Sequence, residues 1–233
     1  MSLRRAIGHF FDHLRAVFRF DTEEGERPVL ILAGQGNPGP KYAGNRHNIG
    51  FMVIDEIMAQ HEFPAWREKF NAMISEGWIV SGDIRAKALL MKPMTFYNES
   101  GQSLAKAAKF YKLPPEAVTL FHDEIDLAQG RCRVKTGGGH SGNNGVRSAI
   151  AHLGNTIRRV RMGVGHPGDK SRVMPYVLSD FSKADTVWVD PLIDACARAI
   201  GFLASGDDER YQTEVMRLAP APKLDPKKKG GSS

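Results

Sequence analysis

Residues 29–39 read VLILAGQGNPG, five apolar residues followed by three glycines within six positions. A short apolar run that ends at glycines is typical of a strand buried on both faces. From this strand onward, apolar runs alternate along the chain with amphipathic patterns of helical period. This alternation predicts an α/β fold, namely a single-domain three-layer α/β/α sandwich around a twisted mixed β-sheet.

The spacing of apolar residues also predicts the other elements. Strands are expected over 73–80, 86–91, 118–122, 131–135 and 159–164. Helices are expected over 48–59, 100–111, 144–152, 191–203 and 207–218.

Both ends of the chain differ in composition from its body. Residues 1–27 combine an Arg-rich pattern of helical period with an acidic linker, and residues 219–233 read APAPKLDPKKKGGSS. We expect an N-terminal amphipathic extension over 1–27, a folded domain over 28–217 and a disordered basic tail over 218–233. For the extension, an organelle-targeting peptide and a helix that docks on the body or on a membrane surface both stay open.

Composition excludes several classes of protein. The 233 residues are 42% hydrophobic, enough for a full core, and no apolar run approaches the roughly 18 residues of a transmembrane helix. Cys132 and Cys196 form no CxxC pair, which excludes a disulfide framework and a Cys-rich zinc site. We therefore expect a soluble cytoplasmic protein that does not associate with membranes.

The net charge of +6 is distributed unevenly. Residues 131–172 contain nine basic residues against Asp169 alone, a net charge of +8, together with nine glycines. A basic, Gly-rich surface of this kind fits a phosphate-bearing polyanion such as a nucleic acid. An ordinary solvated basic face is the alternative, and charge alone does not decide between them.

The loop after the first strand, GQGNPG at 34–39, matches the GxGxxG pattern, and Asp55 lies near the distance of a ribose-binding acid. A dinucleotide site needs a helix N-terminus in this loop, but prolines and glycines break any helix before about Asn48. We therefore reject that interpretation. The same segment leads to His47, which is a candidate base beyond a strand end, although a lone loop histidine is commonly structural.

Three further stretches carry polar groups that could do chemistry. Asn98 follows the strand at 86–91 and is either a substrate-facing amide or a helix cap. Residues 122–126 (HDEID) place three carboxylates past a strand, where one could orient an imidazole, and no PCxxC or HExxH motif supports a metal site. The loop at 137–145 offers backbone N–H groups to an anion but lacks the Lys-Ser/Thr of a P-loop. Without a GxSxG elbow or an activated cysteine, water is the expected nucleophile.

Together these stretches resemble the bacterial peptidyl-tRNA hydrolases, enzymes that recycle tRNA from prematurely released peptidyl-tRNA. The matching motifs occur in the family's order across 28–217: GNPGPKYAGNRHNIGF, KPMTFYNESG, HDEIDL, KTGGGHSGNNG and RMGVGHPG. The resemblance implies hydrolysis of an ester without a metal or other cofactor. It also implies a peptidyl-tRNA substrate bound at its acceptor stem and 3′ end, no obligate protein partner and a monomeric state.

The resemblance further implies roles for single residues. His47 is implied as the general base and Asp123 as the carboxylate that orients it. Asn37, counted with the catalytic residues, and Asn98 resemble the amides that position the peptide and the scissile ester. Asn144 resembles the residue that holds the catalytic water and the 3′ end.

Other residues are implied in binding. Lys135 and Arg161 resemble the clamp on the 5′-phosphate of the tRNA. The cleft is lined or neighboured by Tyr42, Phe96 and His140. Three residues depart from the family's pattern and are expected to adjoin functional positions without replacing one: Gln35, Asn45 and Tyr97.

A non-catalytic RNA-binding relative of the same fold, like the chloroplast intron-splicing proteins, is the alternative function. A protein that only binds RNA has no need for a base, an orienting carboxylate and three amides together. All five are present in this sequence, which favours the enzyme.

Overall fold

The computed structural model describes residues 29–222. The predicted extension over 1–27 and the tail beyond 222 lie outside the described residues. Helix α8 (Asp208–Leu218) reaches one residue past the expected domain boundary at 217, and Ala219 behind it is buried. Residues 218 and 219 therefore belong to the folded body rather than to a disordered tail, because their apolar surface packs against it.

The middle layer is a sheet of seven strands in the order β2-β3-β4-β1-β5-β7-β6. β1 lies at its centre and pairs in parallel with β4 and β5, and β5 pairs in parallel with β7. β2, β3 and β4 pair antiparallel at one edge, and β6 pairs antiparallel with β7 at the other, so the predicted mixed sheet is confirmed. The strands are β1 (Leu30–Gly34), β2 (Arg67–Lys69), β3 (Ala72–Ser81), β4 (Ile84–Pro93), β5 (Val118–Glu124), β6 (Cys132–Thr136) and β7 (Arg158–Gly163).

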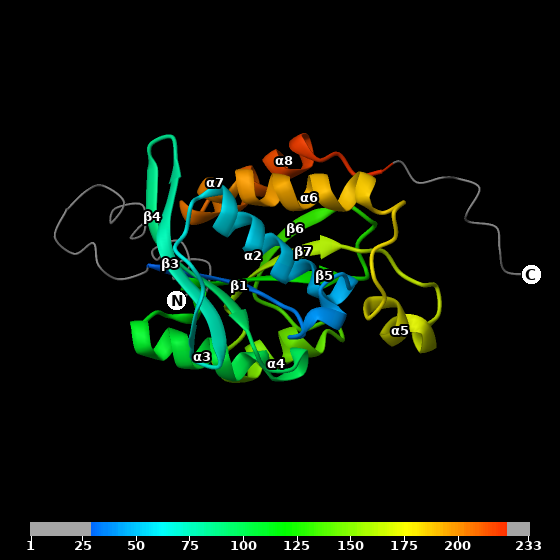
Figure 1. Cartoon of the computed structure of the whole chain (residues 1–233), viewed down its shortest axis with the longest axis horizontal. Helices are drawn as coiled ribbons and strands as arrows, with labels where there is room; N and C mark the ends of the chain where they lie inside the picture. Colours follow the sequence, from blue (N-terminus) through cyan, green and yellow to red (C-terminus); the bar gives the residue numbers. More distant parts are fainter. Residues whose placement is uncertain (1–28, 223–233) are drawn as a thin grey trace, which may run out of the picture.

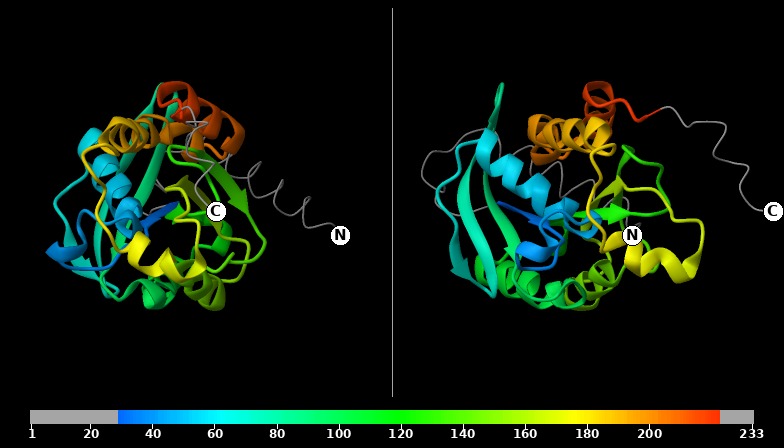
Figure 2. Two further views of the ribbon diagram at one scale, coloured as in Figure 1. Left: turned by 90° about the vertical axis from the view of Figure 1, so that its right-hand side faces the viewer. Right: turned by 45° about the vertical axis from the view of Figure 1, so that its right-hand side comes forward.

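Helices cover both faces of this sheet, which gives the predicted three layers (Figures 1 and 2). Alternate strand residues point to opposite faces. Leu32 and Leu90 pack in the core under α2, α6, α7 and α8, whereas Ile31 and Leu89 pack in the core under α3 and α4. The helices are α2 (Ile49–Gln60), α3 (Ser100–Tyr111), α4 (Asn144–Leu153), α5 (Val173–Val177), α6 (Thr186–Arg198), α7 (Ile200–Ala204) and α8 (Asp208–Leu218).

Some boundaries differ from those that the sequence predicts. The helix expected over 191–203 begins at Thr186 and is divided at Ala199 into α6 and α7. Pro191 lies inside α6 instead of at its start, because burial of residues such as Trp188 and Leu192 outweighs the single helix hydrogen bond that a proline omits. β2 and α5 have three and five residues, too few to show a periodic pattern.

The N-terminus of α2 touches the sheet through its backbone. A Cβ atom on Gly50 would lie 2.3 Å from the carbonyl oxygen of Phe121 in β5, and one on Gly34 in β1 would lie 2.4 Å from the carbonyl oxygen of Gly50. Only residues without a side chain permit so close an approach. The start of α2 is therefore held directly against the ends of β1 and β5.

Among residues 29–222, no helix is both long enough and apolar enough to cross a bilayer.

Candidate active site

The candidate site lies where the parallel strands β1, β4 and β5 end, because the loops that follow them meet at one edge of the sheet. His47 belongs to a 3₁₀ turn, η2 (Arg46–Asn48), that leads into α2. Its Nδ1 lies 2.9 Å from Oδ2 of Asp123 near the end of β5. The His47 side chain is 15% exposed and that of Asp123 only 2%, so a substrate can reach the imidazole but not the carboxylate.

Electrostatics keep the Asp123 carboxyl group ionised. Burial alone would raise its pKa, but the interaction with His47 and the hydrogen bond from Tyr97 outweigh burial, and the pKa of Asp123 is lowered. Since an ionised carboxylate only accepts hydrogen bonds, Nδ1 of His47 carries the proton between them. The other ring nitrogen, Nε2, is then left with a free lone pair.

Asn37 is held in one orientation by two neighbours. Its backbone N–H donates to Oδ1 of Asn48 at 2.9 Å, and Nδ2 of Asn48 donates to the Asn37 carbonyl oxygen at 2.9 Å. The Oδ1 atom of Asn37 accepts the backbone N–H of Tyr97 at 3.0 Å. Because the side-chain oxygen is engaged, the Asn37 amide offers N–H donors to a ligand.

Tyr97 adjoins two of the predicted catalytic residues, as the sequence leads us to expect. Its ring stacks on the His47 imidazole, with centroids 3.5 Å apart and planes 9° from parallel. Its hydroxyl donates to Oδ1 of Asp123 at 2.6 Å. Burial, followed by the charge of Asp123, raises the pKa of Tyr97 well above its usual value, so the phenol stays a donor. In the sequence, only its position next to Asn98 indicated that Tyr97 lies close to the site.

Asn98 and Phe96 lie on the loop between β4 and α3. Asn98 is exposed in the 3₁₀ turn Tyr97–Glu99, and Phe96 is 63% exposed. Glu99 occupies the N-cap position of α3 and makes no side-chain cap hydrogen bond. The geometry thus favours an accessible amide at Asn98 over the helix-cap alternative.

The Gly-rich loop brings a further asparagine to the site. Asn143, which sequence reasoning did not select, caps α4 by accepting the Val146 backbone N–H at 3.0 Å, and its Nδ2 donates to the Tyr97 hydroxyl at 2.9 Å. The predicted residue Asn144 begins α4 and is half-buried. His140 lies in the same loop, where its Nδ1 accepts the Gly142 backbone N–H at 3.2 Å.

The predicted phosphate clamp lies on the strands next to Asp123. Arg161 in β7 donates through Nε to Oε2 of Glu124 at 2.9 Å, so the last residue of β5 fixes its guanidinium. Lys135 in β6 pairs in register with Arg159 of β7. The Arg159 guanidinium donates to the carbonyl oxygens of Gly137 and Gly139, which ties the Gly-rich loop to this edge of the sheet.

Tyr42 precedes η2 in the chain and lies in the 3₁₀ turn Pro40–Tyr42. Its ring is half-buried, with the Lys41 ammonium 4.7 Å from the ring centroid. The Tyr42 carbonyl oxygen accepts the Asn45 backbone N–H at 2.9 Å, two residues before His47.

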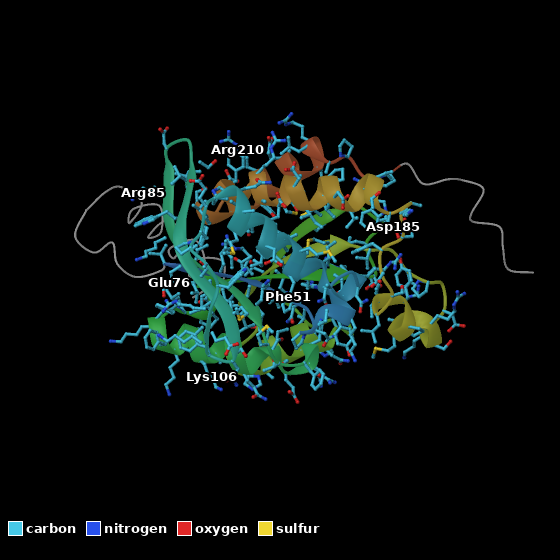
Figure 3. All side chains as sticks on the ribbon, viewed as in Figure 1. Phe51, Glu76, Arg85, Lys106, Asp185 and Arg210 are labelled. Atoms are coloured by element: carbon cyan, nitrogen blue, oxygen red, sulfur yellow. The ribbon has the colours of Figure 1, made fainter. Side chains whose placement is uncertain are left out.

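Arg46 anchors η2, the turn that carries His47, to a distant segment, and sequence reasoning missed these contacts. Its guanidinium donates to Asp185 Oδ2 at 2.8 Å and to the Asp180 carbonyl oxygen at 2.6 Å, and it stacks 4.6 Å from the Tyr176 ring. Figure 3 shows Asp185 beside the start of α6, on the side of the molecule where α5 lies. Since the two aspartates are 139 and 134 residues away in sequence, no local pattern could reveal these contacts.

The described residues offer little to a metal ion or a dinucleotide. Within 29–222, no three His, Cys, Asp or Glu side chains cluster so that they could hold a metal ion. The GxGxxG loop is followed by the short turn Pro40–Tyr42, and α2 begins only at Ile49. The loop therefore lacks the helix N-terminus that a pyrophosphate would need.

Comparison with known proteins identifies relatives along nearly the whole described region. The family model described as peptidyl-tRNA hydrolase matches residues 31–223. A peptidyl-tRNA hydrolase of Hyphomonas neptunium is 65% identical over 199 residues, which cover 85% of this chain and 96% of the relative. One of Caulobacter vibrioides is 56% identical over 200 residues, covering 86% of this chain and 98% of the relative. The crystal structure of the Acinetobacter baumannii peptidyl-tRNA hydrolase superposes with a TM-score of 0.75 at 34% identity, covering 83% of this chain and 97% of that one. On these grounds the chain belongs to the peptidyl-tRNA hydrolase family.

Proposed function

We propose that this protein hydrolyses the ester bond between the peptide and the 3′-terminal ribose of peptidyl-tRNA, and so recycles tRNA from stalled or aborted translation. The observation that carries the proposal is the 2.9 Å contact between His47 Nδ1 and Asp123 Oδ2. It leaves Nε2 as a base that removes a proton from water while the water attacks the ester carbonyl. The imidazolium that forms is stabilised by the adjacent carboxylate, and such general-base help typically supplies about 10²–10⁴-fold.

The asparagines supply the remaining polar contacts. The N–H donors of Asn37 meet negative charge on the carbonyl oxygen in the transition state, where one preorganised donor is worth about 3–4 kcal/mol. Asn98 binds the peptide backbone, with Tyr42, Phe96 and His140 beside it. Asn144 holds the water and the 3′ end. A peptide amide satisfies these groups, whereas the charged amine of a free aminoacyl-tRNA leaves them unpaired.

The basic edge of the sheet binds the nucleic acid. Lys135 and Arg161 hold the 5′-phosphate, and the +8 segment at 131–172 attracts the acceptor stem with little reading of base sequence. In this proposal the protein acts in the cytoplasm as a monomer, without a metal, another cofactor or an obligate protein partner.

A decisive test measures release of N-acetyl-amino acid from N-acetyl-aminoacyl-tRNA by the wild-type chain and by His47→Ala. The matched control is His61→Ala, because His61 is a half-buried histidine at the opposite end of α2. We expect release by the wild type and the control, and a loss of at least 10²-fold in His47→Ala. Salt-sensitive tRNA binding without any release would instead favour the RNA-binding alternative. Equal release by all three proteins would keep the enzyme but remove His47 as its base.

A further inference from the structure

We infer that Tyr97 is a positioning residue that holds both members of the His47–Asp123 pair, the imidazole through its ring and the carboxylate through its hydroxyl. The inference rests on the proposed function for its meaning in catalysis. Its structural basis is independent of that function. One side chain stacks 3.5 Å from the imidazole and donates at 2.6 Å to the carboxylate that the imidazole contacts.

The hydroxyl fixes the carboxylate at the oxygen that His47 does not use. Oδ2 of Asp123 faces Nδ1 of His47, and Oδ1 accepts the Tyr97 hydroxyl. Asn143 donates to the same phenol oxygen at 2.9 Å, so the hydroxyl proton is directed to Asp123 rather than to the asparagine. Rotation of the carboxylate would break a hydrogen bond at each of its oxygens, which keeps Oδ2 facing Nδ1 of His47.

The ring fixes the imidazole from one face. The two planes are within 9° of parallel, so the imidazole cannot turn about its Cβ–Cγ bond without a clash against the phenol. An aromatic face also attracts the imidazolium that forms when the base takes its proton. Space for the phenol exists because residue 145 is glycine: a Cβ atom there would lie 2.5 Å from Cε1 of Tyr97.

The backbone of the same residue reaches the third member of the site. The Tyr97 N–H donates to Oδ1 of Asn37 at 3.0 Å and thereby turns that amide's N–H groups toward a ligand. A substitution of the side chain leaves this bond in place. Effects of changing the phenol therefore report on the His47–Asp123 pair and not on Asn37.

The first test compares Tyr97→Phe with the wild type in steady-state hydrolysis of N-acetyl-aminoacyl-tRNA. Phenylalanine retains the stack and removes the hydroxyl. Because Tyr97 is buried, with only 4% of its surface exposed, we expect kcat to fall about tenfold with KM within a factor of two. The ionisable groups around the phenol are Asp123 and Glu124 of β5, His47 of the catalytic turn and His122 beside Asp123. Loss of a donor leaves more negative charge on Asp123, so the acid limb of the pH profile of kcat/KM moves to higher pH.

Tyr111→Phe is the matched control. The Tyr111 hydroxyl also donates to a carboxylate, Oε1 of Glu76 at 2.5 Å, but from α3 to β3 and away from His47. Figure 3 shows Glu76 on the side of β3 and β4, away from Asp185 and α5. This variant loses the same kind of bond, and we expect it to keep the kcat and pH profile of the wild type.

A double variant separates positioning from a general structural effect. If Tyr97 acts through His47, then His47→Ala/Tyr97→Phe hydrolyses substrate at the rate of His47→Ala alone. Losses that multiply, or a Tyr97→Phe protein with the kcat, KM and pH profile of the wild type, would overturn the inference. If Tyr97→Phe does not fold, Asn143→Ser replaces it, because serine keeps a cap for α4 and removes the donor to the phenol; we expect a loss in kcat of about threefold.

An NMR spectrum of the imidazole separates failure of this inference from failure of the proposed function. The signal of the proton on Nδ1 of His47, which faces Asp123, should change in Tyr97→Phe and stay in place in Tyr111→Phe. This change is expected whether or not the protein hydrolyses peptidyl-tRNA. An unchanged signal in both variants would show that the phenol does not act on the pair.

Discussion

The end of β5 and the edge formed by β6 and β7 lie side by side in the sheet, yet they are built on opposite principles. At the end of β5, Asp123 is buried and receives hydrogen bonds at both oxygens, and the turn that carries His47 is anchored by Arg46. At the neighbouring edge, Arg133 and Lys135 are exposed to solvent. The first region is buried and held by hydrogen bonds, whereas the second presents exposed positive charge. Under the proposed function, we expect the first region to set the rate of the reaction and the second to set the affinity for RNA.

The largest effect should come from Asp123→Asn. The amide keeps the shape of the side chain but offers an N–H or an uncharged oxygen to His47, which removes both the fixed tautomer and the stabilised imidazolium. We expect kcat to fall by about 10²–10⁴-fold with KM nearly unchanged. Asp126→Asn, an exposed carboxylate three residues later, is the control that should keep full activity. A loss below threefold in Asp123→Asn would contradict the catalytic role proposed for the buried end of β5.

Gly50→Ala tests the backbone contact that holds α2 against the sheet. Its Cβ would lie 2.3 Å from the Phe121 carbonyl oxygen, so α2 must move and carry the catalytic turn with it. We expect a loss of about 1–3 kcal/mol in the free energy of unfolding and a fall of roughly tenfold in kcat, since small misplacements of a catalytic group are costly. Urea unfolding and hydrolysis would be measured together. The stability control is Gly139→Ala, where the added Cβ meets no atom within 4 Å.

Removal of charge from the other region should change affinity instead of chemistry. For Lys135→Gln and Arg161→Gln we expect KM to rise by about three- to tenfold each at low salt, with kcat preserved. The slope of log kcat/KM against log salt should become shallower by about one for each variant. Lys106→Gln on α3, far from this edge in Figure 3, is the matched control. A fall in kcat with unchanged salt dependence would contradict the division between the two regions.

The smallest effect concerns stability against acid. In the folded protein the pKa of Asp123 lies below 3.8, the usual value for an aspartate. Its ionised form therefore stabilises the fold at neutral pH. This contribution is complete above the unfolded value and is lost as pH falls through the lower, folded value. We therefore expect the free energy of unfolding of the wild type to decline below about pH 4, and to decline less steeply for Asp123→Asn. Urea titrations between pH 3 and pH 6 would measure the difference.

The sequence predicts the layers and most elements because their apolar residues recur with a clear period. The buried strand at 29–33 and the helix at 100–111 are examples, and the structure places them at β1 (Leu30–Gly34) and α3 (Ser100–Tyr111). Elements of three to five residues, such as β2 and α5, could not be predicted in this way, since they are shorter than the pattern that would reveal them.

The candidate site, like the fold, could be predicted from the sequence only in part. The motifs that carry His47, Asp123 and Asn37 are recognisable in the sequence, and the structure brings these three residues together through Tyr97 and the carboxyl ends of the strands. The contacts of Tyr97 and Arg46 could not be predicted. Each depends on partners that only the folded sheet brings near, 26 residues away for the Tyr97 phenol and 139 for the Arg46–Asp185 pair.

The contact between Gly50 and Phe121 also bears on how such a protein tolerates change. Main-chain atoms set the spacing between the start of α2 and the end of β5. This spacing therefore does not depend on the size of the hydrophobic side chains in the core. A substitution such as Leu89→Val, in the core under α3 and α4, should lower the melting temperature. We expect it to leave the contact between His47 and Asp123 unchanged. For such core substitutions we expect the stability of the fold and the alignment of His47 with Asp123 to vary separately, which thermal unfolding and hydrolysis measured on the same variant would test.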